Sequence, residues 1–326
     1  LVGSEMCIRD RHMEGQSSKV SIIIPTLNRV SSLARTLGFI SKSSIPPDEI
    51  IIVDQSPRDT AEKTKKLCDS QTLKIKYIHI NEPSLTGARN AGIELCKNDI
   101  AIFMDDDVDI GTDTIKNILV LFKDNSISMV AGIDSGSPMK RLSLPSLIFF
   151  RSSFFKRYKG HVAMAGYGVF PQNPQAETPT EWAMGFFFAI RKSLAQKWGL
   201  KFDENLKYYA YAEDMDFTYR YFLKSKEENL KCIMSTAATV LHNVSKEYRL
   251  PSRQRTFMEI CHRRYVMSKH GNSILRKLIM LWSDIGTAIL RIKRGEPASD
   301  VFKAIAFAIK YRRDIKKGVF HYDKFM

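Results

Sequence analysis

The segment FMDDDVD, residues 103–109, contains four aspartates, which follow the apolar run IAIFM. Carboxylates packed this closely repel one another and raise each other's pKa. Asp105 and Asp107 are two positions apart, so their side chains point to the same side if the chain stays extended. Oxygen ligands on one side form half a cage for Mg²⁺ or Mn²⁺, with open positions for water and a diphosphate. A solvated turn capped by the aspartates is the alternative for such a pair alone, and the glycine and glutamate of an EF-hand loop are missing.

The elements that must position these aspartates alternate regularly over residues 19–134. Short β-branched runs such as KVSIII, EIIIVD and DIAIFMD are separated by segments with helical spacing, among them VSSLARTLGFIS and TGARNAGIELCK. Strands separated by helices of about 10 to 15 residues predict βαβ units and a mostly parallel sheet. Ligands bind such sheets beyond the carboxyl ends of the strands. Pro25-Thr26, Asp54 and Asp105–Asp107 each follow an apolar strand, so one ligand crevice is expected at that edge.

The second half of the chain is less regular before order returns. Residues 138–179 mix aromatic with basic residues, for example in SLPSLIFFRSSFFKRYKG. From Thr180 onward the sequence contains the apolar segment GFFFAIRKS, the acidic helix start YAEDMDFTYR and the short strand AATVLH, which ends at His242. Beyond Pro251 every segment has helical spacing, interrupted at KHGNS and RGEPAS. The sequence therefore predicts an α/β fold followed by a helical C-terminal extension.

Six segments resemble one known family. VSIIIPTLNR, EIIIVDQS, TGARNAGI, IAIFMDDDV, GFFFAIRKS and YAEDMDFTYR occur in the order and rough spacing of glycosyltransferase family 2, whose members are inverting enzymes with the GT-A fold. The resemblance covers about residues 19–245. The chain departs from the family at Gln55 and Ser56, where a second Asp and a Gly are common.

The sequence divides into a leader, a region that carries the resemblance and a C-terminal extension. Its first ten residues, LVGSEMCIRD, resemble a translated sequencing adapter, so residues 1–12 are expected to be non-native and Met13 to be the native start. The remaining regions are a GT-A catalytic domain (13–245), comprising a nucleotide-binding half (about 19–134) and an acceptor-binding half (about 135–245), and a basic helical extension (246–326).

On the nucleotide side, the resemblance implies roles for four residues. Pro25 and Thr26 would shape the first loop against the nucleotide. Asp54 would accept a hydrogen bond from the base, as a carboxylate can from a uracil-like N–H, and a turn cap is the alternative. Arg89 would lie near the nucleotide, where its donors suit diphosphate or base oxygens, and a surface charge is the alternative.

The same resemblance implies a metal site. Asp105 and Asp106 would contact the nucleotide sugar, and Asp105 and Asp107 would hold Mn²⁺ or Mg²⁺. Some members of the family carry a histidine after the acidic helix that completes the metal site, and His242 matches that placement. A hydrogen-bonded surface or core histidine is the alternative for His242.

For the acceptor side, the resemblance implies that Asp214 is the general base. An inverting transfer needs one, because the acceptor hydroxyl must lose its proton as it attacks the anomeric carbon. Glu213 would orient the acceptor or the base, and Asp216 is assigned structural work. The alternative for Asp214 is a helix cap or a partner of the helix dipole. Trp182 and Gly185 would line the sugar pocket.

The charge of the chain is concentrated in its last quarter. The net charge is +15, and residues 246–326 carry 19 Lys and Arg against 7 Asp and Glu, a surplus of 12. Two amphipathic segments there, LRKLIMLWSDIGTAILRIKR and VFKAIAFAIKYRRDIKK, are typical of helices that lie on an anionic membrane surface. The alternative is that they pack on the catalytic domain. No apolar stretch reaches the roughly 18 residues needed to span a bilayer.

These observations predict a metal-dependent inverting glycosyltransferase that moves a sugar from a UDP-type donor to a sugar or lipid-linked acceptor, in cell-surface polysaccharide or glycolipid synthesis. Apart from Cys7, the four cysteines are far apart and form no C-x-x-C pair, which favours a cytoplasmic location, peripheral on the inner face of the cell membrane. A catalytically inactive GT-A-like scaffold is the alternative. A nucleic-acid partner is not expected, because no helix-turn-helix, RRM or zinc signature accompanies the charge.

Overall fold

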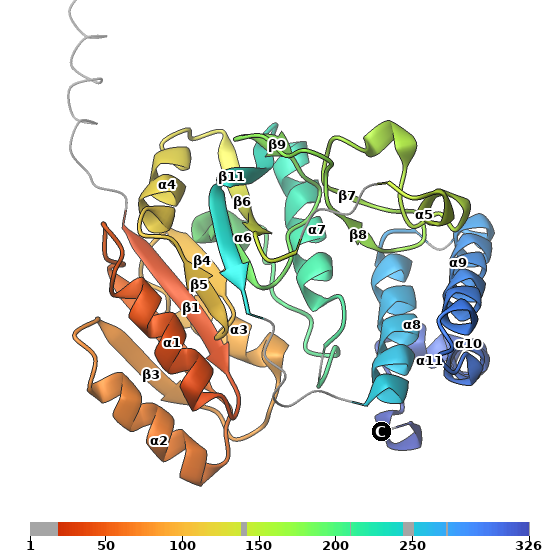
Figure 1. Ribbon diagram of the computed structural model, residues 1–326, viewed down its shortest axis with the longest axis horizontal. Coiled ribbons are helices and arrows are strands. Elements are labelled where there is room, and N and C mark those ends of the chain that lie inside the picture. The colour runs from red at the N-terminus through yellow and green to blue at the C-terminus, as the bar shows by residue number, and fades with distance from the viewer. Residues whose placement is uncertain (1–18, 138–141, 209, 244–250, 272, 326) are drawn as a thin grey trace, which may run out of the picture.

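The computed structural model describes residues 19–137, 142–208, 210–243, 251–271 and 273–325. The expected leader at 1–12 and the expected domain boundary near 245 lie outside these residues. The described chain forms a central sheet covered by helices, with a group of C-terminal helices beside it (Figure 1).

The central sheet has the strand order β3-β2-β1-β4-β10-β6-β11-β5, and β9 also pairs with β11. Strands β1 to β4 are mutually parallel and so are β6 and β11, whereas β10 is antiparallel to both β4 and β6. The nine strands are β1 (Val20–Thr26), β2 (Glu49–Asp54), β3 (Ile75–His79), β4 (Ile100–Met104), β5 (Val108–Ile110), β6 (Ile127–Asp134), β9 (Thr178–Pro179), β10 (Phe187–Arg191) and β11 (Lys231–His242). A separate pair joins β7 (His161–Val162) to β8 (Gly168–Val169).

Helices cover both faces of this sheet, and β1 shows how the sequence allows it. Ile22 and Ile24 pack in the core beneath α1, α2 and α4, whereas Ile23 lies in the opposite core with α3, α6 and α7. Strands buried on both faces contain continuous apolar runs, as β1 does. The mostly parallel α/β fold predicted from the sequence is confirmed. The helices are α1 (Val30–Ile40), α2 (Arg58–Asp69), α3 (Leu85–Leu95), α4 (Thr114–Leu121), α6 (Lys192–Lys197) and α7 (Glu213–Glu227).

Two local features differ from the sequence-based expectation. Residues 106–107 form a turn between β4 and the short strand β5, so the extended chain, on which the same-side placement of Asp105 and Asp107 was conditional, is not present. Strand β11 is longer than the predicted AATVLH, because it begins at Lys231 and pairs with β6 before reaching β5. Both differences arise from pairing between distant strands.

The C-terminal helices pack against the rest of the chain. Phe257 and Cys261 of α8 lie in one apolar core with Trp182, Leu206 and Met215. The packing alternative concerned the two amphipathic segments that follow α8, and Ala288 and Val301 of these segments lie in the same core. These helices and the short α5 beside them are α5 (Leu144–Ile148), α8 (Ser252–Lys269), α9 (Ile274–Lys293), α10 (Ser299–Lys310) and α11 (Arg312–Lys316).

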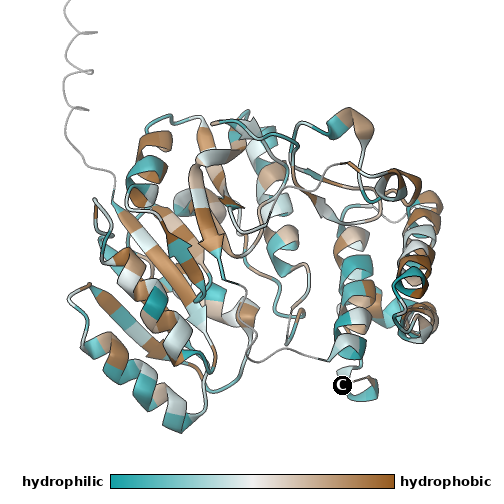
Figure 2. Cartoon of the chain, in the orientation of Figure 1, coloured by the Kyte–Doolittle hydropathy of each residue, from teal (hydrophilic) through white to brown (hydrophobic). Residues whose placement is uncertain are grey.

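Helix α9 lies at one edge of the molecule (Figure 1), and parts of its ribbon have the colour of hydrophobic residues (Figure 2). Ile274, Leu275 and Leu278 are all more than half exposed. Across the described residues, no helix combines the length and apolar character that a membrane span requires.

Candidate active site

Strand pairing brings three segments together at the end of β4. Because β10 pairs with β4, the amide of Asp105 donates to the carbonyl of Phe186 at 3.0 Å. Because β5 pairs antiparallel with β11, His242 stands opposite Val108 and next to Asp107. The imidazole Nε2 of His242 lies 3.2 Å from Oδ1 of Asp107, and its ring stacks on Phe186 at 5.2 Å between centroids.

Asp105, Asp107 and His242 form a candidate metal site. One ligand atom from each lies within 4.8 Å of the others. The two carboxylates suit Mn²⁺ or Mg²⁺, and an imidazole is a ligand that transition-metal ions accept more readily than Mg²⁺ does. Burial raises the pKa of Asp105, against the opposing charge of Arg89. Burial acts to lower the pKa of His242, but its hydrogen bond to Asp107 and the nearby carboxylates outweigh burial and raise it. Charge crowding of this kind is what a bound cation would relieve, so the residues fit the metal predicted from the sequence.

Asp106 points away from this cluster. Its carboxylate accepts a hydrogen bond from Thr26 Oγ1 at 2.6 Å and forms an ion pair with Arg29 at 3.1 Å. Burial raises the pKa of Asp106 to about 7, although Arg29 and Thr26 act to lower it. Asp106 therefore anchors the loop after β1, and its contact with a nucleotide sugar stays a prediction.

Arg89 of α3 is the buried centre of the site. Its guanidinium pairs with Glu213, donates to Asp105 at 3.0 Å and donates to the carbonyl of Gly185 at 3.0 Å. With 1% of its side chain exposed, Arg89 is not a surface charge, and that alternative is wrong. Burial raises the pKa of Glu213 to about 8, although Arg89 opposes the shift.

Asp214 lies at the start of α7 and is partly exposed. Its carboxylate accepts from the amides of Gly185 and Met215, both at 2.7 Å. Burial raises its pKa above the usual range, while Arg89 and these amides act to lower it. Asp216, two residues on, is fully buried and pairs with Lys269 at 2.8 Å, in agreement with its predicted structural work.

A cavity of about 330 Å³ joins part of these groups, whereas Asp106, Asp107 and Asp216 are buried and do not line it. Trp182 lies in its wall, where its indole N–H donates to the carbonyl of Val169 at 3.1 Å, and Gly185 leaves no room for a side chain against Arg89. The predicted residues that line the cavity are Arg89, Asp105, Trp182, Gly185, Glu213, Asp214 and His242.

A second hollow, of about 350 Å³, lies beyond the ends of β1, β2 and β3. Asp54 does not line it, because its carboxylate is buried and accepts from Tyr77 Oη at 2.9 Å and from the amide of Ser56 at 2.8 Å. Pro25 lies in β1 beside Val53. The contacts predicted for Pro25 and Asp54 with a nucleotide therefore stay predictions.

Sequence reasoning missed three residues near the site. His79 ends β3 and lines the second hollow, and Arg29 follows β1 and pairs with Asp106 and Asp107, so the strand-end rule that selected Thr26 would also have found them. Tyr167 lines the 330 Å³ cavity from the irregular segment before β8, where no periodic pattern marks it.

The amino-acid sequence is similar to those of known glycosyltransferases. A profile described as "Glycosyl transferase family 2" matches residues 21–199. Among curated relatives, the poly(ribitol-phosphate) beta-N-acetylglucosaminyltransferase TarP of Staphylococcus aureus is 26% identical over 65% of this chain and 60% of its own length. The O-antigen chain rhamnosyltransferase RfbN of Salmonella typhimurium is 30% identical over 35% of this chain and 36% of its own length. The chain thus matches less than two thirds of either relative.

Solved structures share the fold. The mannosyltransferase PcManGT from Pyrobaculum calidifontis, in complex with GDP-Man and Mn²⁺, superposes with a TM-score of 0.56 at 15% identity over 98% of this chain and 92% of its own. Residues 1–349 of TarS from Staphylococcus aureus, in complex with UDP-GlcNAc, give a TM-score of 0.50 at 16% identity over 80% of this chain and 70% of theirs. At these identities the likeness shows the GT-A fold alone.

Proposed function

Because the chain belongs to glycosyl transferase family 2 and is a glycosyltransferase, we propose that it transfers a sugar from a nucleoside diphosphate to an acceptor hydroxyl, with inversion at the anomeric carbon. The observation that carries this proposal is the shared cavity, which Asp105 and His242 line together with Asp214. Two of the three residues of the candidate metal site thus lie on the walls of the same space as the partly exposed carboxylate of Asp214.

The reaction assigns Asp214 a defined step. The acceptor oxygen bonds to the anomeric carbon, its proton passes to a carboxylate oxygen of Asp214, and the bond to the diphosphate oxygen breaks with its electron pair leaving on the nucleoside diphosphate. The amides of Gly185 and Met215 hold the carboxylate in place. Glu213, fixed by the buried Arg89, orients the acceptor.

Asp105, Asp107 and His242 would hold the divalent cation, Mn²⁺ or Mg²⁺, which supplies Lewis-acid stabilisation of the leaving diphosphate. The nucleotide then extends toward the hollow beyond β1 to β3, where Pro25 and Thr26 shape the first loop. We assign a UDP-type donor, whose base contacts Ser56 and His79 on the wall of the hollow. Asp54 holds Ser56 in position, because its carboxylate accepts a hydrogen bond from the Ser56 amide. The acceptor is a sugar or a lipid-linked sugar of cell-surface polysaccharide or glycolipid synthesis, the field to which the names of TarP and RfbN belong.

The proposed partner of the C-terminal helices is an anionic membrane on the inner face of the cell. Two observations support it: the exposed apolar stripe of α9, which includes Leu275, Trp282 and Ile292, and the surplus of 12 positive charges in residues 246–326. Each Lys or Arg near an anionic surface contributes about 1 kcal/mol, so a part of this surplus suffices for attachment.

Donor hydrolysis tests the catalytic proposal without knowledge of the acceptor. We expect Mn²⁺ and UDP together to raise the melting temperature more than either alone, and slow release of UDP from at least one UDP-sugar. Cooperative binding of Mn²⁺ and UDP without hydrolysis or transfer from any nucleotide sugar in a panel would instead support the inactive scaffold. Preferred stabilisation by GDP would overturn the UDP assignment and leave the reaction class standing.

A further inference from the structure

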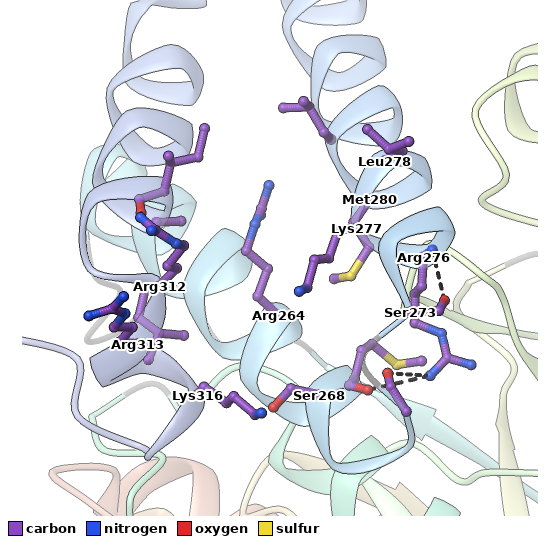
Figure 3. A pocket seen from close by; sticks show the side chains of 16 residues that line it. Arg264, Ser268, Ser273, Arg276, Lys277, Leu278, Met280, Arg312, Arg313 and Lys316 are labelled. Atoms are coloured by element: carbon purple, nitrogen blue, oxygen red, sulfur yellow. Dashed lines mark hydrogen bonds between the residues drawn. The ribbon is translucent and has the colours of Figure 1, made fainter.

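A cavity of about 390 Å³ lies between helices α8, α9, α10 and α11, outside the catalytic site (Figure 3). Among the described residues, none that lines it also lines the cavity containing Asp214. In Figure 3, Arg312 and Arg313 stand on one side, Lys277 stands on the other, and Arg264 extends between them. The helices thus enclose a space that the proposed transfer reaction does not use.

The floor of this cavity is apolar. Met267, Met280 and Ile315 are buried beneath it. Leu278 and Ile309 line it as well, and both are more than half exposed. The apolar lining therefore continues from the buried floor to the outer surface of α9 and α10, the surface proposed to face the bilayer.

The charged side chains in the remaining lining are all basic. No acidic side chain lines the cavity in the part of the chain that the structure describes, and six basic ones do: Arg264, Arg276, Lys277, Arg312, Arg313 and Lys316. Within that part, the one lining side chain that forms an ion pair is Arg264, whose partner Asp284 is shared with the buried Arg263. Several like charges without carboxylate partners create a positive potential that attracts an anion.

We propose that this cavity binds the phosphate headgroup of an anionic membrane lipid, with the first part of its hydrocarbon on the floor formed by Met267 and Met280. The inference rests on the proposed attachment to a membrane and adds a specific lipid site to it. The six basic side chains form a cationic rim that favours a phosphate group. The apolar floor opens to the surface at Leu278 and Ile309, which favours a ligand that is both charged and apolar. A polyanionic polymer would satisfy the rim but would leave the floor exposed to water, at a cost of about 25 cal/mol per Å² of apolar surface.

The position of α8 gives the site a link to catalysis. Gly166, which lines the catalytic cavity, packs on Met267 and Arg263 so closely that a Cβ at this glycine would approach Met267 Cγ to 2.6 Å. Met267 also lines the lipid cavity. Helix α8 therefore separates the catalytic cavity from the lipid cavity. A lipid held by Arg313 and Lys316 would place the membrane surface beside the acceptor side of the catalytic cavity.

The test uses dihexanoyl phosphatidylglycerol below its micelle concentration, titrated into the full chain by calorimetry. We expect the double variant Arg313→Gln, Lys316→Gln to bind it about 30-fold more weakly, because each of the two charges contributes about 1 kcal/mol. Both side chains are exposed, so folding should not change. The matched control Lys293→Gln, Lys303→Gln removes two exposed charges from α9 and α10 outside the cavity. It should weaken binding to anionic vesicles but keep the affinity for the monomeric lipid.

A third variant tests the floor, because Ser268→Phe places a ring in the cavity and should also reduce binding. Dihexanoyl phosphatidylcholine and glycerol phosphate should bind at least tenfold more weakly than the phosphatidylglycerol. Equal affinity of glycerol phosphate or of polyphosphate would overturn the lipid assignment, and equal loss in the control variant would overturn the cavity as the site. Hydrolysis of the UDP-sugar should be unchanged in all three variants, so failure here is distinguishable from failure of the proposed reaction.

Discussion

Asp106 and Asp107 are neighbours in the chain and both pair with Arg29, but their other partners differ. Asp107 faces His242, whereas Asp106 accepts a hydrogen bond from Thr26. We expect Asp107→Ala to abolish transfer and to remove the Mn²⁺-dependent part of UDP binding, because a cation would link this carboxylate to the diphosphate. Isothermal titration of UDP with and without Mn²⁺ measures both effects, and an unchanged Mn²⁺-dependent affinity would contradict the assignment.

Asp214 is distinguished from the metal ligands by a substitution that keeps its shape. Asp214→Asn retains an oxygen that can accept from Gly185 or Met215, but it loses the ability to take a proton. Binding of Mn²⁺ and UDP should survive, while kcat falls by about 10²–10⁴-fold, the range for general base catalysis. A capping role predicts near-normal kcat, because Asn caps a helix almost as well as Asp. Measuring kcat and UDP affinity together decides between these roles.

The pH dependence of kcat gives an independent test of the same residue. Burial raises the pKa of Asp214, and a protonated carboxyl cannot accept the acceptor's proton. Activity should therefore fall as the pH decreases through this raised pKa, at a pH above the value of about 3.9 that is usual for aspartate. This fall in kcat at low pH, the acid limb of the pH profile, should be absent from the residual activity of Asp214→Asn. An identical limb in both proteins would assign it to another group.

At the scale of elements, the start of α7 carries backbone strain at the catalytic cavity. Ala212, the residue before the helix, has a φ of 63° in the left-handed region, which costs a residue with a Cβ roughly 1–2 kcal/mol. Ala212→Gly should raise the free energy of unfolding by up to about 1 kcal/mol, measured by denaturant titration. Ala195→Gly in α6, at a buried helical position, should instead lower it. Destabilisation by Ala212→Gly would show that the strain is absent in solution.

The elements also show which parts of the site could be predicted from sequence. The apolar runs of β1, β2 and β4 are nearly continuous because parallel strands are buried on both faces, so these strands and the residues at their ends were predictable. The position of His242 depends on pairing between β11 and β5, and the contact of Gly185 with Asp214 depends on β10 entering the sheet between β4 and β6. Such long-range pairings leave no local pattern, and only the resemblance to a family indicated these residues.

At the scale of the whole molecule, apolar and charged surfaces are distributed unequally. The outer stripe of α9 is close to α5, because the indole N–H of Trp282 donates to the carbonyl of Ile148 at 2.9 Å, and Ile148 and Phe150 are exposed beside it. Helix α4, which carries the exposed Val120, lies on the opposite side of the molecule (Figure 1). Together with the surplus of 12 positive charges in residues 246–326, this arrangement favours one face for contact with a bilayer.

Substitutions on that face test the proposed membrane contact while leaving the shared core of α8 intact. Leu275→Gln with Ile292→Gln should reduce co-sedimentation with anionic vesicles by about tenfold or more, because burying one such side chain contributes about 1.5–3 kcal/mol. The control Ile45→Gln with Val120→Gln changes two exposed apolar residues outside the C-terminal helices, and this variant should bind vesicles normally. Binding of the unsubstituted chain should weaken as salt increases. The bilayer assignment is wrong if the α9 variant keeps its vesicle binding. If sedimentation velocity then shows that the unsubstituted chain is a dimer and the variant is a monomer, the stripe is an interface between copies of the chain.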